Sequence, residues 1–180
     1  MTKRAALTGI VICASITVVL VIALVFVHAY RKITLLSHTV DQAWADVVAV
    51  EISRVNIAAQ LTAKPTETMK KTQSYDAVLA AQRGSFQDPT ADAFTAIINF
   101  ENALAQFKTE NNDSIAASDE LSTFAAQLGQ SQNVFREDLT SYNNAVNAYN
   151  AAVQSAPSAK ILFFATKPTF DTNSLANPTL

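Results

Sequence analysis

The residue types that most often bind metals or transfer protons are scarce in this sequence. Its histidines are His28 and His38. Ten residues of helix rise about 15 Å, so one metal ion could not bind both side chains. The sequence contains no His-Glu-x-x-His, no Cys-x-x-Cys, no nucleophile elbow and no glycine-rich phosphate loop. We therefore expect no metal and no cofactor.

The carboxylates that could share a proton are sequence neighbours, and they form two pairs: Asp119-Glu120 and Glu137-Asp138. Adjacent side chains on a helix point about 100° apart, so neither pair forms a shared site by itself. Acidic residues near a helix start are explained more simply by their favourable interaction with the helix dipole. We therefore expect the protein not to be an enzyme.

Three aromatic residues could line a cage for a ligand: Trp44, Tyr142 and Tyr149. They could instead pack in a core, with their polar tips hydrogen-bonded to partners. All three fall on apolar helical stripes, which favours core packing.

A row of asparagines accompanies the tyrosines in "SYNNAVNAYNAAVQSAP" (141–157). Asn143, Asn147 and Asn150 are spaced by four and three residues, which places them side by side on a helix. They form either a solvated, uncharged edge or a set of groups that hydrogen-bond a neighbouring helix and fix its register, as buried asparagine does in coiled coils. We favour the second interpretation.

The N-terminal part of the sequence, which leads into the helix that contains Trp44, begins with an apolar run. "AALTGIVICASITVVLVIALVFV" (5–27) has 23 uncharged, mostly apolar residues, and about 20 suffice to cross a bilayer as a helix. It is longer than the core of a signal peptide and lacks a good cleavage site. We expect an uncleaved transmembrane helix in the cell membrane, preceded by a short tail at 1–4. The flanking charges, two basic residues on each side, leave the orientation open.

Composition indicates the fold class and the expected partners of the chain beyond the apolar run. Only three glycines and 49% hydrophobic residues favour long helices. Beyond Lys32, nine basic and 15 acidic residues give a net charge of −6. Nucleic-acid-binding proteins gather basic residues on one face, so nucleic acid is not an expected partner.

The spacing of apolar residues predicts four soluble helices, at 28–63, 66–86, 89–109 and 115–154. The first has an apolar stripe formed by Leu36, Val40, Trp44, Val48, Ile52, Val55 and Ala59. Asp88 should cap the third helix with Pro89 in its first turn, and Pro157 should end the fourth. The expected fold is all-α. The transmembrane helix continues into a long antiparallel four-helix bundle at 28–156, connected up-down-up-down.

The fourth helix has a near-heptad stripe, typical of a coiled-coil seam, and should pair with the first. For antiparallel helices whose distal ends lie near 63 and 115, equal rise per residue sets the register. Tyr142 should lie near Leu35–Val40 and Trp44 near Gln132–Leu139, within a turn or two.

The C-terminal segment at 157–180 contains an apolar cluster and then a polar tail. The cluster, "ILFF" at 161–164, includes Phe163 and Phe164 and is too short to span a bilayer. It could fold back and cap the open end of the bundle, or it could dip into the lipid interface with Lys160 and Lys167 at the headgroups. We favour capping.

Four segments of the chain resemble motifs of the LemA family of membrane-anchored helical proteins. They are "TVDQAWADV" (39–47), "QLGQSQN" (127–133), "YNNAVNAYNAAVQSAP" (142–157) and "ILFFATKPTF" (161–170). The sequence departs from the family at "NIAAQLT" (56–62), where Ala59 stands in place of a proline. The resemblance implies a helical bundle. The molecular function of that family is not established.

These observations favour a single-pass membrane protein whose helical domain is a non-catalytic interaction or scaffold module. Its partners would be the lipid bilayer, through residues 5–27, and another membrane or envelope protein. The alternative is a membrane-anchored sensor that binds a small ligand between the helices of its bundle. The sequence leaves the oligomeric state open.

Overall fold

The computed structural model describes residues 3–63 and 88–175 of the chain. Within these residues every regular element is helical and none is a strand, which confirms the all-α class. The helix expected at 66–86 lies outside the described residues, so the four-helix, up-down-up-down arrangement stays a prediction.

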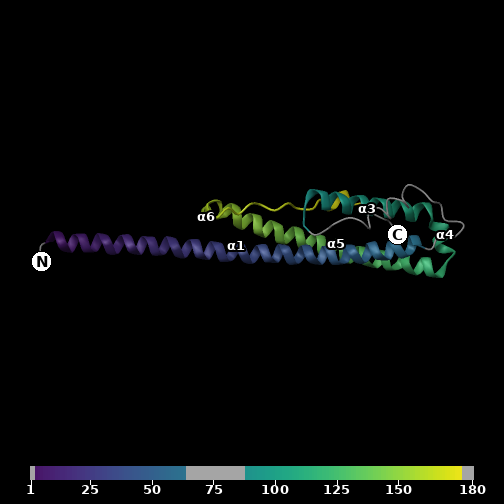
Figure 1. The fold of residues 1–180 in the computed structure, drawn as a ribbon, viewed down its shortest axis with the longest axis horizontal. Helices are drawn as coiled ribbons and strands as arrows, with labels where there is room; N and C mark the ends of the chain where they lie inside the picture. Colours follow the sequence, from purple (N-terminus) through teal and green to yellow (C-terminus); the bar gives the residue numbers. More distant parts are fainter. Residues whose placement is uncertain (1–2, 64–87, 176–180) are drawn as a thin grey trace. The chain divides into compact units, whose positions relative to one another are not determined.

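The first helix, α1 (Lys3–Ala63), runs for 61 residues without interruption (Figure 1). It joins the expected membrane segment to the first soluble helix, as the sequence predicts. No glycine or proline occurs between Gly9 and Pro65, and these residues are what most often ends or kinks a helix. Among the described helices, α1 is the one long and apolar enough to cross a membrane. Its most apolar window has a mean hydropathy of 2.7, and none of that window is buried. A signal sequence would pass the same test.

The next described helix, α3 (Ala91–Glu110), begins two residues later than expected, and its N-cap is Thr90 rather than Asp88. The Thr90 hydroxyl accepts a hydrogen bond of 3.2 Å from the backbone N–H of Ala93, which satisfies one of the free donors of the first turn. Pro89 therefore precedes the cap and does not occupy the first turn.

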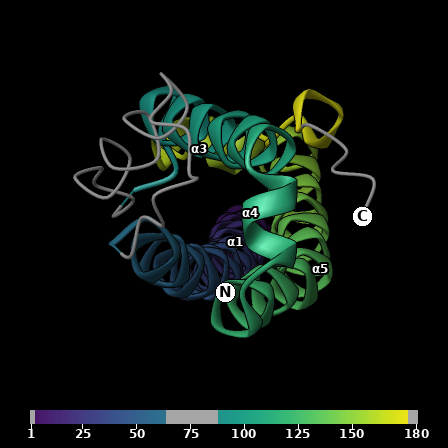
Figure 2. The same ribbon diagram turned by 90° about the vertical axis from the view of Figure 1, so that its right-hand side faces the viewer.

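Two short helices were not expected from the sequence. α4 (Asn112–Ala116) links the end of α3 to the start of α5 (Asp119–Ser155), as Figure 2 shows. α5 ends just before Pro157, as predicted, but this proline then opens α6 (Pro157–Ile161). The fixed φ of proline suits the first position of a helix. A 3-10 turn, η1 (Thr172–Ser174), is the last described element.

The chain divides into two compact units. The first unit combines Met1–Thr39 with Ala148–Lys167, so it contains the start of α1, the end of α5, and α6. The second unit combines Val40–Asn147 with Pro168–Leu180 and contains the rest of α1 and α5 together with α3 and α4. Its core draws apolar side chains from three helices, among them Val47, Ile97, Phe100, Phe107, Phe135 and Leu139.

In the second unit, α1 and α5 run antiparallel (Figure 1). The rings of Trp44 and Tyr142 pack with their centroids 5.3 Å apart. Each residue thus meets the other about one helical turn beyond its expected range, Gln132–Leu139 for Trp44 and Leu35–Val40 for Tyr142. The predicted pairing of the first and fourth helices is therefore correct to about a turn.

The buried face of α1 departs from the predicted stripe. Val40 and Trp44 are buried as expected, but Val48 is half-buried and Ile52 is 49% exposed. The residues buried on this face beyond Trp44 are Val47, Glu51, Arg54, Val55 and Ala58. Repeated steps of four residues exceed the helical period of about 3.6, so the predicted stripe turns away from the core. The observed face alternates steps of three and four, and it therefore brings two charged residues inside.

Candidate functional site

Two Tyr-Asn pairs on α5 bind the backbone of the extended chain that follows α6. Tyr142 and Asn143 belong to the second unit, and Tyr149 and Asn150 belong to the first. Both tyrosines are buried and both asparagines are half-buried. We call each pair, together with the backbone that it binds, a Tyr-Asn clamp.

The clamp of the first unit binds the chain at Lys167. Asn150 Nδ2 donates to the Lys167 carbonyl at 2.9 Å, and the Lys167 N–H donates to Asn150 Oδ1 at 2.8 Å. The Tyr149 hydroxyl donates to the Ala165 carbonyl at 2.9 Å. The Lys167 ammonium lies 5.5 Å from the centroid of the Tyr149 ring, within the range of a cation–π contact. The Asn150 side chain thus satisfies the backbone N–H and C=O of Lys167, as a neighbouring strand would in a sheet.

The clamp of the second unit repeats the arrangement at Phe170. Asn143 Nδ2 donates to the Phe170 carbonyl and the Phe170 N–H donates to Asn143 Oδ1, both at 2.8 Å. The Tyr142 hydroxyl donates to the Pro168 carbonyl, also at 2.8 Å. The Phe170 ring is buried against Phe94 of α3, with centroids 5.1 Å apart.

The spacing of the two pairs suits an extended chain. Seven residues of helix rise about 10.5 Å, and three residues of extended chain rise about 10 Å. Pro168 has no N–H to satisfy and falls between the two asparagine contacts. In the C-terminal segment, these hydrogen bonds all go to main-chain atoms, so they recognise its backbone.

The prediction for the asparagine row was wrong about the partner. Asn143 and Asn150 hydrogen-bond the extended C-terminal segment and not a neighbouring helix. Asn147 is exposed, as the alternative of a solvated edge requires. The seven-residue repeat of Tyr-Asn could have distinguished Asn143 and Asn150 from Asn147, because no tyrosine precedes Asn147.

Trp44 and Tyr142 lie in an aromatic core and do not form an open cage. Trp44 is 4% exposed, and its ring packs against Phe94 with centroids 5.6 Å apart. Tyr142 contacts Phe94 as well, at 6.2 Å, so it touches α3 in addition to α1. Burial first, and then the nearby carboxylate of Asp41, raise the pKa of Tyr142 to about 12. Its hydroxyl therefore stays protonated and donates to the clamped backbone.

The apolar cluster at 161–164, which we call the apolar elbow, is divided between two environments. Phe164 is half-buried and its ring packs on Tyr30 of α1 in the first unit, with centroids 5.8 Å apart. Ile161 and Phe163 are 63% and 93% exposed. The prediction that the cluster packs back on the helices therefore holds for Phe164, but not for Ile161 or Phe163.

The backbone of the apolar elbow follows a Schellman turn at the end of α6. The Phe164 N–H donates to the Ala159 carbonyl at 3.0 Å, and the Phe163 N–H donates to the Lys160 carbonyl at 3.4 Å. This turn places Phe163 at φ 59, in the left-handed region. Glycine usually occupies that position because a Cβ atom there costs about 1–2 kcal/mol. Phe163 is therefore strained and, being exposed, gains little from packing.

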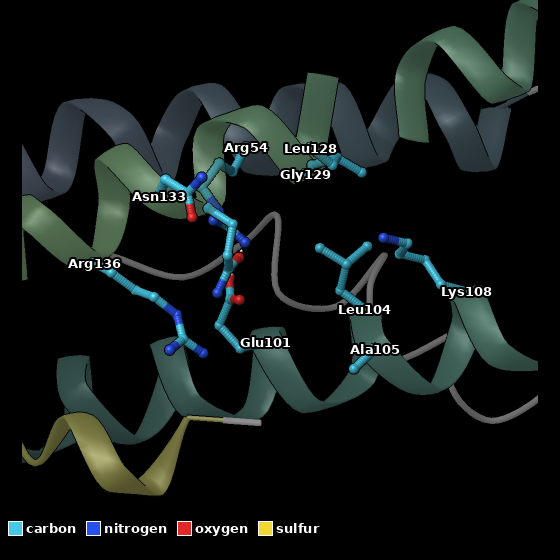
Figure 3. A pocket seen from close by; sticks show the side chains of 10 residues that line it. Arg54, Glu101, Leu104, Ala105, Lys108, Leu128, Gly129, Asn133 and Arg136 are labelled. Atoms are coloured by element: carbon cyan, nitrogen blue, oxygen red, sulfur yellow. Dashed lines mark hydrogen bonds and ion pairs between the residues drawn. The ribbon is translucent and has the colours of Figure 1, made fainter. Parts of the chain in front are cut away.

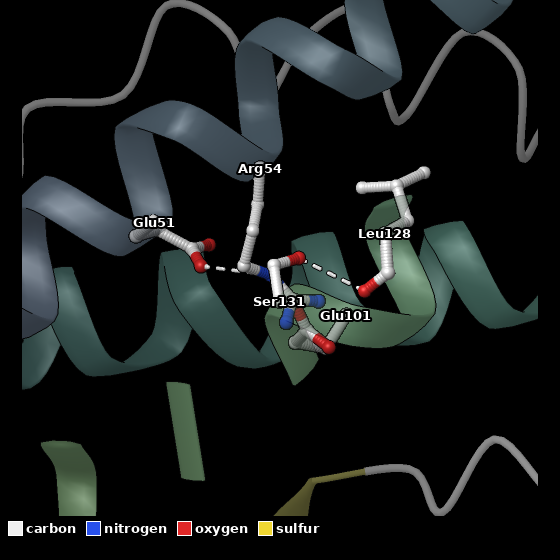
Figure 4. Close-up of polar contacts among 5 residues, drawn as sticks. All are labelled: Glu51, Arg54, Glu101, Leu128 and Ser131. Atoms are coloured by element: carbon white, nitrogen blue, oxygen red, sulfur yellow. Dashed lines mark hydrogen bonds and ion pairs between the residues drawn. The ribbon is translucent and has the colours of Figure 1, made fainter. Parts of the chain in front are cut away.

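A group of charged side chains is buried in the second unit (Figure 4). Arg54 Nη2 of α1 donates to Glu101 Oε1 of α3 at 2.5 Å, and Arg54 Nε lies 3.7 Å from Glu51 Oε2. The side chains of Glu51 and Arg54 are 0% exposed and that of Glu101 is 2% exposed. The Arg54 guanidinium also lies 4.9 Å from the centroid of the Phe135 ring. One arginine therefore serves two buried carboxyl groups.

Burial changes the protonation of both carboxyl groups. Desolvation, reinforced by Glu101 and opposed by Arg54, raises the pKa of Glu51 to about 8. Desolvation also raises the pKa of Glu101, although Arg54 and the neighbouring Gln132 act against it. Near neutral pH Glu51 is therefore protonated, beside the contact between Arg54 and Glu101.

A cavity of about 140 Å³ adjoins this charged group (Figure 3). Arg54 and Glu101 point toward one another in its wall, and Arg136 of α5 extends toward α3. The residues that line it are Arg54, Glu101, Leu104, Ala105, Lys108, Leu128, Gly129, Gln132, Asn133 and Arg136. This site was not predicted from the sequence. The predicted buried stripes contain only apolar residues, such as Val48 and Ile52 on α1. The signal was present in the alternating three- and four-residue steps through Glu51 and Arg54.

No group of three or more histidine, cysteine, aspartate or glutamate side chains able to hold a metal ion occurs in the part of the chain that the structure describes. No family model, no curated protein and no solved structure matches the chain. The resemblance to the LemA family therefore stays a prediction. The function is inferred from the residues themselves.

Proposed function

We propose that this protein is a single-pass membrane protein whose helical domain serves as a non-catalytic interaction module. The observation that carries the proposal is α1, in which an exposed apolar stretch continues without a break into a helix packed in protein. Residues 5–27 supply 23 uncharged residues, and about 20 suffice to cross a bilayer. The same helix then supplies Trp44 and Val47 to a core, so the anchor and the domain share one element.

In this proposal the chain is a LemA-type protein with an antiparallel four-helix bundle at 28–156. α1, α3 and α5 supply three of its helices, and the helix that the sequence predicts at 66–86 lies outside the described residues. The heptad-like burial of α5 supports a coiled-coil seam, because its buried residues continue in steps of three and four: Leu128, Gln132, Phe135, Leu139, Tyr142, Val146 and Tyr149.

The exposed half of the apolar elbow, Ile161 and Phe163, makes a second contact with lipid. Its neighbour Phe164 packs on Tyr30, which follows the apolar run by three residues, about 4.5 Å of helix rise. This is the level at which aromatic residues meet lipid headgroups. Lys160 is exposed beside the elbow and suits the headgroup region. An exposed phenylalanine kept in a strained conformation supports a role outside the fold.

The partner of the domain is another membrane or envelope protein. The net charge of −6 beyond Lys32 disfavours nucleic acid. The Tyr-Asn clamps fill the backbone-binding face of α5 with the protein's own C-terminal segment, so the partner binds elsewhere on the domain. Cross-linking in intact membranes should join the protein to another membrane protein. A chain that remains monomeric after exhaustive cross-linking would contradict the interaction role.

Extraction of membranes with alkaline carbonate tests the anchor. The full-length protein should remain in the pellet, because carbonate releases peripheral proteins and leaves transmembrane ones. Changing Val21→Arg and Leu24→Arg together should release it, because each charge in the bilayer costs about 2.5–3.5 kcal/mol. Leu35→Arg is the matched control, since Leu35 is 68% exposed on the same helix beyond the apolar run. Release of the unchanged protein would contradict the proposal.

A second candidate is a sensor that binds a small ligand between helices of the domain. The observation that favours it is the cavity beside Arg54 and Glu101, which is lined by residues of three helices.

A further inference from the structure

The cavity beside the Arg54–Glu101 pair has hydrogen-bond donors without acceptors. Arg54 Nη1 and Gln132 Nε2 are buried and have no hydrogen-bond partner among the described residues, and Arg54 Nε has only the 3.7 Å ion pair with Glu51. All three are donors, and both side chains line the cavity. The Gln132 amide lies beside Glu101 and lowers its pKa, but its Nε2 does not reach hydrogen-bond geometry. A buried donor left unpaired is destabilising, so an acceptor in the cavity would stabilise the site.

The charges on the cavity wall favour an acceptor that is negative. The lining contains three basic side chains, Arg54, Lys108 and Arg136, and one carboxyl group, that of Glu101. Glu101 is paired with Arg54 and is also attracted by Arg136, so three basic groups share one carboxyl group in the cavity wall. Lys108 is half-buried, and desolvation first, then repulsion by Arg54, lowers its pKa. Water in the cavity could accept hydrogen bonds, but it would not offset this positive charge.

A glycine in the middle of α5 keeps the cavity open. Gly129 lines it and lies ten residues inside a helix of 37. Glycine in a helix interior makes the helix less stable than alanine would. A Cβ atom at this position would project into or against the cavity wall. Gly129 therefore makes α5 less stable at the point where the helix lines the cavity.

We propose that this cavity binds a small oxyanion, a molecule with a carboxylate or phosphate group. Its oxygen atoms would accept hydrogen bonds from Arg54 and Gln132, and its charge would pair with Lys108 and Arg136. A cavity of about 150 Å³ holds a molecule of benzene size, so the ligand has about six non-hydrogen atoms. The inference rests on the sensor candidate, for which it names the ligand class, and it does not depend on the membrane anchor.

Isothermal titration calorimetry on the full-length protein in detergent tests the proposal. Inorganic phosphate and acetate are titrated separately at constant ionic strength, with chloride as the balancing anion. Saturable binding of either one is expected, and the stronger of the two distinguishes a phosphate from a carboxylate ligand. Lys108→Met and Arg136→Gln should each weaken binding about tenfold or more, because each removes a charged hydrogen-bond donor. Lys160→Met, an exposed lysine of the first unit, is the matched control and should bind like the unchanged protein.

Gly129→Ala gives a second test that does not depend on loss of stability. It should raise the melting temperature by about 2–4 °C, because alanine favours the helix, and it should also weaken oxyanion binding. A destabilised variant cannot imitate this combination.

The results that would overturn the proposal are equally specific. Binding of neither anion, or binding that Lys108→Met and Gly129→Ala leave unchanged, would show that the cavity is not an oxyanion site. If benzene binds saturably and the anions do not, the ligand class is wrong while the sensor candidate stands. If none of the three probes binds, both the ligand class and the sensor candidate fail.

Discussion

Asn143→Ala is the sharpest perturbation of a Tyr-Asn clamp. It removes two hydrogen bonds of 2.8 Å to the N–H and C=O of Phe170. It leaves α5 intact, since alanine is a better helix former than asparagine. Any loss of stability therefore reports the clamp and not the helix.

The magnitude follows from the burial of the clamped residue. Phe170 is 3% exposed, so its two backbone groups would have little access to water once the amide is gone. Each unsatisfied buried group costs about 1–3 kcal/mol, so the two groups together give a loss of about 2–6 kcal/mol in the free energy of unfolding. Detaching the segment would not avoid the loss, because burial of the Phe170 ring is worth about 1.5–3 kcal/mol.

Two measurements on the full-length protein in detergent would check this. Urea denaturation should show the loss for Asn143→Ala, while Asn147→Ala, an exposed position on the same helix, should change stability by less than about 0.5 kcal/mol. Amide hydrogen exchange should become faster at Phe170 in Asn143→Ala and at Lys167 in Asn150→Ala. Equal stabilities of the 143 and 147 variants, with unchanged exchange at Phe170, would refute the clamp.

Three further predictions concern single residues. Trp44→Ala should lower the free energy of unfolding by about 3–5 kcal/mol, because the side chain is 4% exposed; a loss below about 1 kcal/mol in urea denaturation would contradict core packing. Phe163→Gly should raise the free energy of unfolding by about 1 kcal/mol in urea denaturation, because glycine adopts a φ of 59° without strain. Because the pKa of Glu51 is raised from 4.5 to about 8, the folded state holds this proton more tightly than the unfolded chain. The free energy of unfolding should therefore fall as the pH rises from 4.5 to about 8, and Glu51→Gln should reduce that slope in urea titrations at several pH values.

The long helices could be predicted because their signals are local. α1 has no glycine or proline between Gly9 and Pro65, and α5 ends just before Pro157. The short helix α4 has five residues, too few for any periodicity, and its "NDS" start is typical of turns. Pro157 was correctly read as an end, but the same residue also starts α6.

The parts of the candidate sites that could not be predicted depend on contacts between distant residues. Arg54 is on the buried face of α1, where it pairs with Glu101, 47 residues further along the chain, and Glu51 pairs with Arg54 there. Charged residues are ordinarily solvated, so the pattern alone favours Val48 and Ile52. The Tyr-Asn repeat was visible, but its partner is an extended segment without periodicity, 17 and 27 residues further along the chain.

The cysteine at position 13 offers the most direct test of the membrane anchor. Cys13 is the only cysteine of the sequence, is exposed in the structure, and lies eight residues, about 12 Å of helix rise, inside the apolar run. A water-soluble maleimide labels a thiol only where water reaches it, and the interior of a bilayer excludes water. In intact membranes a water-soluble maleimide should leave Cys13 unlabelled, and dissolving the membranes in denaturing detergent should make labelling complete. Equal labelling before and after detergent, or a mature protein from which Cys13 has been cleaved, would contradict the account.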